Sequence, residues 1–226
     1  NHLQTRNVLT MGHNRYFFAG DLPAKTTIAL IGEEMHHLTK VMRQKIKDTV
    51  EIINGQGEIA QAQIVALDKN QAQLFLTEVT AVAPPPEQII LAQALCRPAK
   101  LDWIVEKTTE LDVSAIYLFP GDNSEKKTLS ANQIDRLHKI CIAAAKQCGR
   151  LFLPEITFKE NLSHCLAEEN NIFFGDLQGA YPSLLLQKKI IFVIGSEKGL
   201  SAKELLMLKN KKAAGIRLSA DILRTE

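Results

Sequence analysis

Lys189-Ile-Ile-Phe-Val-Ile-Gly-Ser-Glu-Lys-Gly-Leu-Ser201 is the stretch that decides the fold of the C-terminal half of this chain. Ile190 to Ile194 form a short unbroken apolar run, which is typical of a parallel strand that is buried on both faces. Gly195 and Gly199 lie in the loop that follows, and Ser201 is a typical N-cap for the next helix. Strand, glycine loop and helix N-terminus in this order predict a ligand site, because α/β sheets bind ligands at the carboxyl ends of their strands.

The glycine loop matches neither of the two common nucleotide-binding patterns. The chain contains no G-x-x-x-x-G-K-S/T string and no G-x-G-x-x-G string. Taken alone, the spacing Gly195-x-Glu197-x-Gly199 is equally consistent with an ordinary strand-to-helix turn. A second segment, Ile222-Leu-Arg-Thr-Glu226, follows a predicted strand from Ala214 to Arg217 and is too apolar for a solvated tail. This second segment favours the ligand site over the simple turn.

The two segments together resemble the C-terminal loops of the SPOUT-class RNA methyltransferases, and within that class the ribosomal small subunit methyltransferase E family. The family loops read Gly-Pro-Glu-Gly-Gly-(Phe/Leu)-Ser and Leu-Gly-x-x-(Ile/Val)-Leu-Arg-x-Glu-Thr-Ala. This chain has Gly195-Ser-Glu-Lys-Gly-Leu-Ser201 and Leu218-Ser-Ala-Asp-Ile-Leu-Arg-Thr-Glu226. Lys198 stands where the family has a glycine. A β-carbon at this position is expected to narrow the cleft that holds the cofactor in the family. The sequence stops before the family's Thr-Ala, so we expect the natural protein to continue beyond Glu226.

Three further stretches extend the resemblance over nearly the whole chain: His36-His-Leu-Thr-Lys-Val-Met-Arg43, Lys100-Leu-Asp-Trp-Ile-Val-Glu-Lys-Thr-Thr-Glu-Leu111 and Ala143-Ala-Ala-Lys-Gln-Cys-Gly-Arg150. The chain departs from the family pattern at two turn glycines. Lys47 replaces the first, so we expect that turn to be built differently. Asp112 replaces the second, and aspartate can adopt the left-handed helix cap at some cost.

The first half of the chain predicts a small β-barrel that resembles the PUA RNA-binding module. Thr27–Leu30, Thr49–Asn54, Glu58–Leu67 and Gln71–Ala81 read as strands with hairpin turns, and Glu33–Gln44 reads as one helix. We assign residues 15–83 to this domain, and residues 1–14 to either a leader or a non-native remnant. The Pro84-Pro-Pro86 run cannot join a sheet interior, so residues 84–87 form a stiff linker.

Residues 88–226 alternate between strands and helices, which indicates a parallel α/β sheet. Strands are predicted at Gln88–Leu95, Ala115–Phe119 and Asn171–Phe174, before the strand at Ile190, and helices at Leu101–Leu111 and Ser130–Gln147. The resemblance implies that this half is a SPOUT methyltransferase domain whose C-terminal segments form a trefoil knot. The fold class is therefore α/β, with a PUA-like barrel followed by a SPOUT domain.

Composition limits the function without naming it. The 226 residues carry a net charge of only +2, so any binding of nucleic acid depends on local basic clusters rather than on the total charge. No apolar run is long enough to span a bilayer and no signal peptide is evident, so we expect a cytoplasmic protein. The four cysteines show no C-x-x-C pair, and we expect reduced thiols and no metal site.

The resemblance implies an enzyme that methylates N3 of a uridine in 16S ribosomal RNA of the small ribosomal subunit, using S-adenosylmethionine, as a homodimer. It places the cofactor against Ile194, Gly195, Ser196, Glu197, Gly199, Leu218, Ile222, Leu223 and Arg224. Catalytic candidates are Arg15 or Arg224 to stabilise the uridine anion, and Glu197 or Glu226 as base or orienting group. Candidate RNA contacts are Arg15, Lys40, Arg43, Lys45 and Arg150. Two alternatives stay open: an RNA-binding SPOUT-like protein that has lost its cofactor, and an ordinary nucleotide-dependent α/β enzyme.

Overall fold

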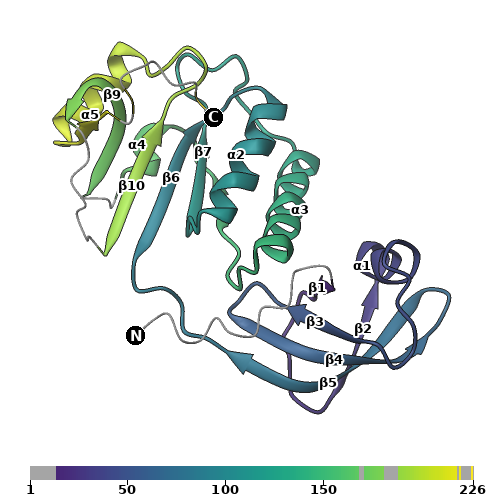
Figure 1. The fold of residues 1–226 in the computed structure, drawn as a ribbon. Helices are drawn as coiled ribbons and strands as arrows, with labels where there is room; N and C mark the ends of the chain where they lie inside the picture. The colour runs from purple at the N-terminus through teal and green to yellow at the C-terminus, as the bar shows by residue number, and fades with distance from the viewer. Residues whose placement is uncertain (1–13, 168–170, 181–187, 218, 220–224, 226) are drawn as a thin grey trace. The chain divides into compact units, whose positions relative to one another are not determined.

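The computed structural model describes residues 14–167, 171–180, 188–217, 219 and 225, which form two compact units (Figure 1). The first unit comprises the chain up to Pro84 together with Ile142–Leu153, and the second comprises the remainder. The division between Pro84 and Pro85 falls inside the proline run. The membership of Ile142–Leu153 in the first unit was not predicted, because it depends on contacts between segments far apart in the sequence.

The first unit is built on a five-stranded curled sheet with the order β1-β3-β4-β5-β2. Its strands are β1 (Arg15–Phe17), β2 (Thr27–Ile31), β3 (Thr49–Ile53), β4 (Glu58–Leu67) and β5 (Gln71–Ala81). All pairs are antiparallel except β1 with β3. Register shifts in the β4–β5 pair bend these two long strands, since an extra residue in one strand locally increases its twist. The inward-facing row of both strands is fully buried: Ala60, Ala62, Ile64, Ala72, Leu74 and Leu76.

The helix predicted at Glu33–Gln44 is shorter and of mixed type. It consists of α1 (Gly32–His36) followed directly by one π-helical segment, η1 (His37–Val41). The chain then leaves the helix through Arg43, whose φ of 53° lies in the left-handed region. The prediction of one regular helix to Gln44 was therefore wrong at its C-terminal end.

Arg15, which was expected to contact RNA, is buried inside the first unit. It is 3% exposed, and its Nε and Nη2 donate to Oε2 of Glu51 at 3.0 and 2.7 Å. The reason lies in the strand register, because the β1–β3 pairing places Arg15 directly opposite Glu51. Its Nη1 donates to the main-chain oxygen of Lys146 at 2.9 Å. Arg15 therefore fastens the segment Ile142–Leu153 to the first sheet.

Three other contacts hold the same segment on this sheet. The Lys146 ammonium pairs with Glu34 at 2.5 Å. The amides of Gly57 and Leu153 donate to the oxygens of Leu151 and Gly55, each at 2.9 Å. Gly57 has a φ of 96°, and a β-carbon on it would lie 2.4 Å from the Phe152 ring. The motif that ends at Arg150 thus belongs to a docking segment.

The second unit is a six-stranded sheet with helices on both faces. The strands are β6 (Gln88–Ala94), β7 (Ala115–Phe119), β8 (Glu155–Phe158), β9 (Ile172–Ala180), β10 (Lys189–Ile194) and β11 (Ala214–Ile216), in the order β11-β9-β10-β6-β7-β8. Every neighbouring pair is parallel. The helices are α2 (Pro98–Glu110), α3 (Ala131–Cys148), α4 (Leu162–Cys165) and α5 (Ala202–Asn210). The part of α3 from Ile142 onward belongs to the first unit.

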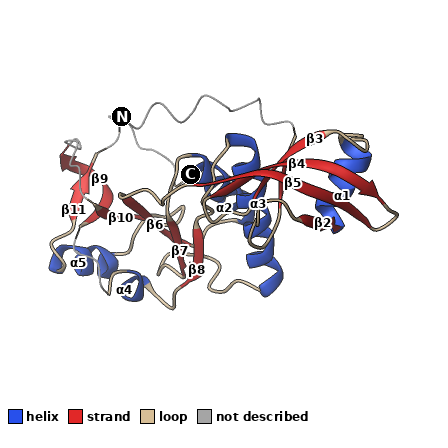
Figure 2. Cartoon of the chain, turned by 90° about the horizontal axis from the view of Figure 1, so that it is seen from below, coloured by secondary structure: helices blue, strands red, loops and turns tan. Residues whose placement is uncertain are grey.

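The direction of each crossover explains the helix layers. From β6 to β8 the strands advance in one direction along the sheet, whereas β9 and β11 lie beyond β10 in the other. Because parallel crossovers are right-handed, α2 and α3 cover one face, and α4 and α5 cover the opposite face (Figure 2). The buried cluster beneath α4 and α5 contains Ile90, Ala92, Ala94, Ile191, Val193, Leu162, Cys165 and Leu208. The expected trefoil knot involves Leu218 and Ile222 to Arg224, which lie outside the described residues.

No helix in the described part of the chain is both long enough and apolar enough to cross a membrane.

Burial raises the pKa of the Cys165 thiol to about 12, although the nearby Lys159 ammonium acts in the opposite direction. This thiol therefore stays protonated and packs as a core side chain.

Both turns that lack the family glycine use a left-handed residue of another type. Lys47 has a φ of 80° and Asp112 a φ of 67°. The predicted left-handed cap at Asp112 is confirmed. Lys47 donates its amide to Ile64 at 2.8 Å, so this strained residue still completes a backbone hydrogen bond.

Replacement of Lys47 by glycine tests the strain at this turn. Lys47→Gly is expected to raise the free energy of unfolding by up to about 1 kcal/mol, because glycine adopts a positive φ without a steric penalty. The measurement is urea denaturation. Lys45→Gly is the matched control, because Lys45 is also exposed but has no positive φ. The control should be neutral or destabilising, and equal effects of both substitutions would contradict the account.

Removal of one partner of the buried Arg15–Glu51 pair tests how the first unit is held together. Arg15→Met is expected to lower the free energy of unfolding by about 3–5 kcal/mol, since it leaves the Glu51 carboxylate buried without its cation. The double variant Arg15→Met/Glu51→Leu should recover much of that loss. Urea denaturation of both variants checks this, and an additive double variant would refute the pairing as the cause.

Candidate functional site

The glycine loop lies at the point in the strand order where the chain changes the direction in which it adds strands to the sheet. β10 lies between β9 and β6, while the chain after β6 proceeds to β7 on the other side. The loops that leave β6 and β10 therefore diverge at the carboxyl ends of these neighbouring strands. Open α/β sheets bind ligands in such a crevice. The register puts Gln93 of β6 directly opposite Ile194 of β10.

The loop after β10 is a tight turn whose two glycines have different functions. A β-carbon on Gly195 would lie 2.6 Å from the carbonyl carbon of Gly199, so the two sides of the loop meet only because Gly195 has no side chain. The Gly199 amide closes the turn on the Ser196 oxygen at 2.8 Å, with a φ of 76° at Gly199. A β-carbon on Gly199 would meet no atom within 4 Å. The main chain at Gly199 is therefore open to close approach.

Lys198 is accommodated on the outer side of this turn. Its side chain is 67% exposed, and its ammonium lies 3.7 Å from Glu125. Gly199 supplies the left-handed residue, so position 198 keeps a backbone that accepts a side chain. The lysine thus extends into solvent.

Glu197 connects the glycine loop to the loop after β6. Its Oε1 accepts the main-chain amide of Arg97 at 2.9 Å. Desolvation raises the pKa of the Glu197 carboxyl, but hydrogen bonds from the amides of Arg97 and of Glu197 itself, with the charges of Lys100 and Arg97, outweigh it. The net pKa is below the usual value. Glu197 is therefore a carboxylate held by donors, which suits an orienting group better than a general base.

The loop after β7 fastens the glycine loop and α5 from another direction. The Asn123 amide donates to the Gly199 oxygen at 3.3 Å. The Ser201 hydroxyl donates to Asp122 at 2.6 Å, and the Lys127 ammonium donates to the oxygens of Gly121 and Asp122. The roles of Asp122 and Asn123 were not predicted, because neither residue lies in a motif and their partners Ser201 and Gly199 are 79 and 76 residues away in the sequence.

Glu204 joins this loop to the start of α5. Ser201 and Glu204 form a capping box, in which the Ser201 amide donates to Glu204 at 2.7 Å and the Glu204 amide donates to the Ser201 hydroxyl at 3.0 Å. The second Glu204 oxygen accepts the amide of Asp122 at 3.0 Å, and the residue is 5% exposed. The capping residue predicted at Ser201 is confirmed.

The C-terminal segment reaches the same place through Thr225. Its hydroxyl donates to the Gly195 oxygen at 2.6 Å, and the Gln93 amide donates to that oxygen at 3.1 Å and to the Thr225 hydroxyl at 3.3 Å. The end of β6 and the loop after β10 are therefore both hydrogen-bonded to Thr225 or to its partner Gly195. The other expected site residues of that end, Leu218, Ile222, Leu223, Arg224 and Glu226, lie outside the described residues.

The candidate RNA contacts differ in accessibility. Lys40, Arg43 and Lys45 are exposed, at the end of η1 and in the loop that follows it. Arg150 is half-buried directly after the Gly149 turn. Arg15 is enclosed with Glu51, so its guanidinium is committed to a contact inside the fold.

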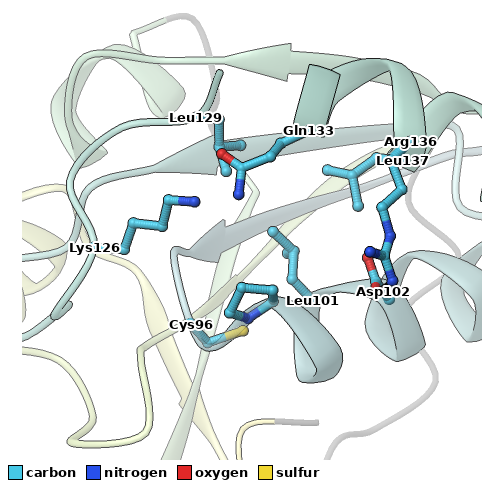
Figure 3. A pocket seen from close by; sticks show the side chains of 9 residues that line it. Cys96, Leu101, Asp102, Lys126, Leu129, Gln133, Arg136 and Leu137 are labelled. Carbon is cyan, nitrogen blue, oxygen red and sulfur yellow. Dashed lines mark hydrogen bonds and ion pairs between the residues drawn. The ribbon is translucent and has the colours of Figure 1, made fainter. Parts of the chain in front are cut away.

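A small pocket lies between α2 and α3, beside the chain that leaves β6 (Figure 3). Its volume of about 50 Å³ suits a few water molecules rather than a cofactor. Leu101, Leu129 and Leu137 form its apolar walls, and the ion pair of Arg136 with Asp102 lies at its edge. Among the described residues, no group of three or more His, Cys, Asp or Glu side chains is arranged to bind a metal ion.

Substitution of Glu204 tests the junction between the β7 loop and α5. Glu204→Ala is expected to lower the free energy of unfolding by about 1–3 kcal/mol, because the Ser201 and Asp122 amides lose a charged acceptor. Urea denaturation gives the value. Lys203→Ala is the control, since Lys203 is its exposed neighbour on α5. A loss no greater than that of the control would show that the junction is not stabilising.

Family models and solved structures agree on the two halves of the chain. Residues 30–77 match the RNA methyltransferase PUA domain, and residues 83–226 match the RNA methyltransferase domain. Two solved structures share the fold: a protein from Legionella pneumophila with bound S-adenosylmethionine, at a TM-score of 0.86 and 24% identity, and the ribosomal RNA small subunit methyltransferase E from Neisseria gonorrhoeae bound to S-adenosylmethionine, at 0.84 and 21%. The alignment with the Legionella protein covers 96% of this chain and 93% of that protein. The alignment with the Neisseria protein covers 94% of this chain and 91% of that protein.

A curated relative supplies the sequence similarity. The ribosomal RNA small subunit methyltransferase E of Buchnera aphidicola is 32% identical over 223 residues, which cover 94% of this chain and 88% of the relative. The corresponding protein of Bacillus subtilis is 27% identical over 88% of this chain and 85% of its own length. The chain therefore belongs to the ribosomal RNA small subunit methyltransferase E family.

Proposed function

We propose that this protein transfers a methyl group from S-adenosylmethionine to N3 of a uridine in 16S ribosomal RNA of the small subunit. One observation carries the proposal: a chain of this family has its glycine loop at the carboxyl ends of β6 and β10, where the strand order reverses. We further propose that the C-terminal segments form the trefoil knot, that the enzyme is a cytoplasmic homodimer, and that the cofactor occupies this crevice.

The described residues fit such a cofactor in two respects. The main chain at Gly199 has open space above it, so a ligand can approach the backbone of the loop. Gln93, beside that loop, carries a buried oxygen without a hydrogen-bond donor among the described residues. We place the cofactor against Ile194, Gly195, Ser196, Glu197 and Gly199, with Leu218, Ile222, Leu223 and Arg224 as the opposite wall. The bound cofactor would supply a methyl group on a sulfonium, from which a neutral thioether departs readily.

The remaining work belongs to the protein: alignment of the acceptor and exclusion of water. Uridine N3 first loses its proton to a base, and the resulting anion would then accept the methyl group, with the electrons of the broken carbon–sulfur bond remaining on sulfur. We assign Arg224 to stabilise the uridine anion and Glu226 to receive or direct that proton. Glu197 orients the loop through Arg97, and Arg15 acts only inside the first unit.

For the RNA, we propose that the exposed cations Lys40, Arg43 and Lys45 contact phosphates, and that Arg150 supports them. Phosphate contacts of this type position the substrate without reading its sequence. They also make affinity dependent on salt, since each contact releases counterions.

Replacement of Glu197 by glutamine separates an orienting role from a proton-accepting role. Glutamine keeps an oxygen that can accept the Arg97 amide, so Glu197→Gln is expected to retain methyl transfer within about tenfold of the wild type. A general base at this position would instead contribute about 10²–10⁴-fold. Single-turnover methyl transfer measures this. The exposed Glu125→Gln is the control for loss of one surface charge, and a loss of a hundredfold or more at Glu197 alone would contradict the orienting role.

Transfer of labelled methyl to small ribosomal subunits that lack the modification tests the proposed function directly. Label is expected on a single uridine, and mass spectrometry of nuclease fragments should place it on N3. RNA binding without any binding of S-adenosylmethionine would instead identify a non-catalytic RNA-binding protein. Label on another base or atom would overturn the assignment of N3.

A further inference from the structure

Gln93 is a buried polar side chain at the end of β6 that no motif drew attention to. It is 1% exposed, and its row of β6 faces away from the cluster that contains Ala92 and Ala94. Its Nε2 donates to the Ala94 oxygen at 2.8 Å, to the Gly195 oxygen at 3.1 Å and to the Thr225 hydroxyl at 3.3 Å. One side-chain amide thus joins β6, the glycine loop and the C-terminal segment.

The chemistry of these neighbours fixes the orientation of the amide. Carbonyl oxygens accept hydrogen bonds and never donate, so the atom that faces Ala94 and Gly195 must be the nitrogen. The Thr225 hydroxyl hydrogen is already used on Gly195, at 2.6 Å. The Thr225 oxygen can therefore only accept from Gln93, and the Gln93 oxygen must face the other way.

That oxygen, Oε1, has no donor among the described residues although it is buried. A buried acceptor without a partner destabilises a fold, and folded proteins rarely leave one unfilled. The position is beside Ile194, at the crevice where the cofactor was placed above. An N–H donor of a bound molecule would satisfy it.

We propose that Oε1 of Gln93 accepts a hydrogen bond from an N–H group of bound S-adenosylmethionine, while Nε2 holds the two loops together. The inference rests on the proposed function, because it assumes that the crevice binds this cofactor. The cofactor offers two such donors, the adenine amino group and the α-ammonium group of its methionine part. Gln93 is thus a ligand-recognising residue on a rigid strand, next to loops that supply main-chain contacts.

A double-mutant cycle between the side chain and the ligand tests this hydrogen bond without any activity assay. Calorimetry measures binding of S-adenosylhomocysteine, of an analogue that has inosine in place of adenosine, and of an analogue without the α-amino group, to wild type and to Gln93→Met. Methionine has a similar length and no acceptor of comparable strength. Gln93→Met is expected to bind S-adenosylhomocysteine about tenfold more weakly than the wild type does. For the analogue that lacks the contacted nitrogen, the same substitution should weaken binding only slightly.

The matched control is Thr225→Val, which removes the other half of the junction and leaves Oε1 in place. Thr225→Val should weaken all three ligands by one common factor. If Gln93→Met also weakens all three equally, Gln93 only holds the loops and the inference is overturned. If wild type binds none of the three, the proposed function fails and the inference with it.

A crystal structure of the wild-type protein with S-adenosylhomocysteine tests the same contact without relying on a variant that folds. A ligand nitrogen within about 3.2 Å of Oε1 is the expected result. A water molecule at that position, or no donor at all, would overturn the inference even if the ligand occupies the crevice.

Discussion

The pairing of β10 between β9 and β6 is the constraint on which the rest of the second unit depends. It is a parallel pairing on both sides, so the chain must leave the sheet and return before each strand is added. The insertion brings Gln93 and Ile194 side by side although 101 positions separate them in the sequence. It also makes the chain diverge after β6 and β10, and this divergence is where we place the cofactor.

Polar side chains then hold the loops at these strand ends in a fixed shape. Loops at strand ends have main-chain groups that no neighbouring strand satisfies, so other partners must be found for them. Glu197 accepts from the β6 loop, Asn123 donates to the glycine loop, and Glu204 accepts from both its own helix and the β7 loop. The shape of the loops follows from these contacts and from the two glycines. Ser196 and Lys198 can therefore differ from the family pattern without altering the turn.

The sequence allowed most elements of regular structure to be predicted, because strands and helices follow local apolar periodicity. The glycine loop was predictable from its glycines and the capping Ser201, and the left-handed Asp112 from the family glycine that it replaces. The burial of Arg15, the docking of Ile142–Leu153 and the contacts of Gln93, Asp122 and Glu204 were not. Each depends on a partner that is distant in the sequence and becomes a neighbour only through the order of the strands. That order cannot be inferred from local patterns in a single sequence. The resemblance to a family supplied the cofactor and the substrate, which neither composition nor spacing identified.

Amide hydrogen exchange with and without S-adenosylhomocysteine tests most directly whether the crevice is the cofactor site. The ligand is expected to slow exchange in peptides that cover Ile194–Gly199 and the C-terminal segment around Thr225. Exchange in β2 and β5 of the first unit should stay unchanged. Protection confined to another part of the chain, with those two segments unaffected at saturating ligand, would contradict the account.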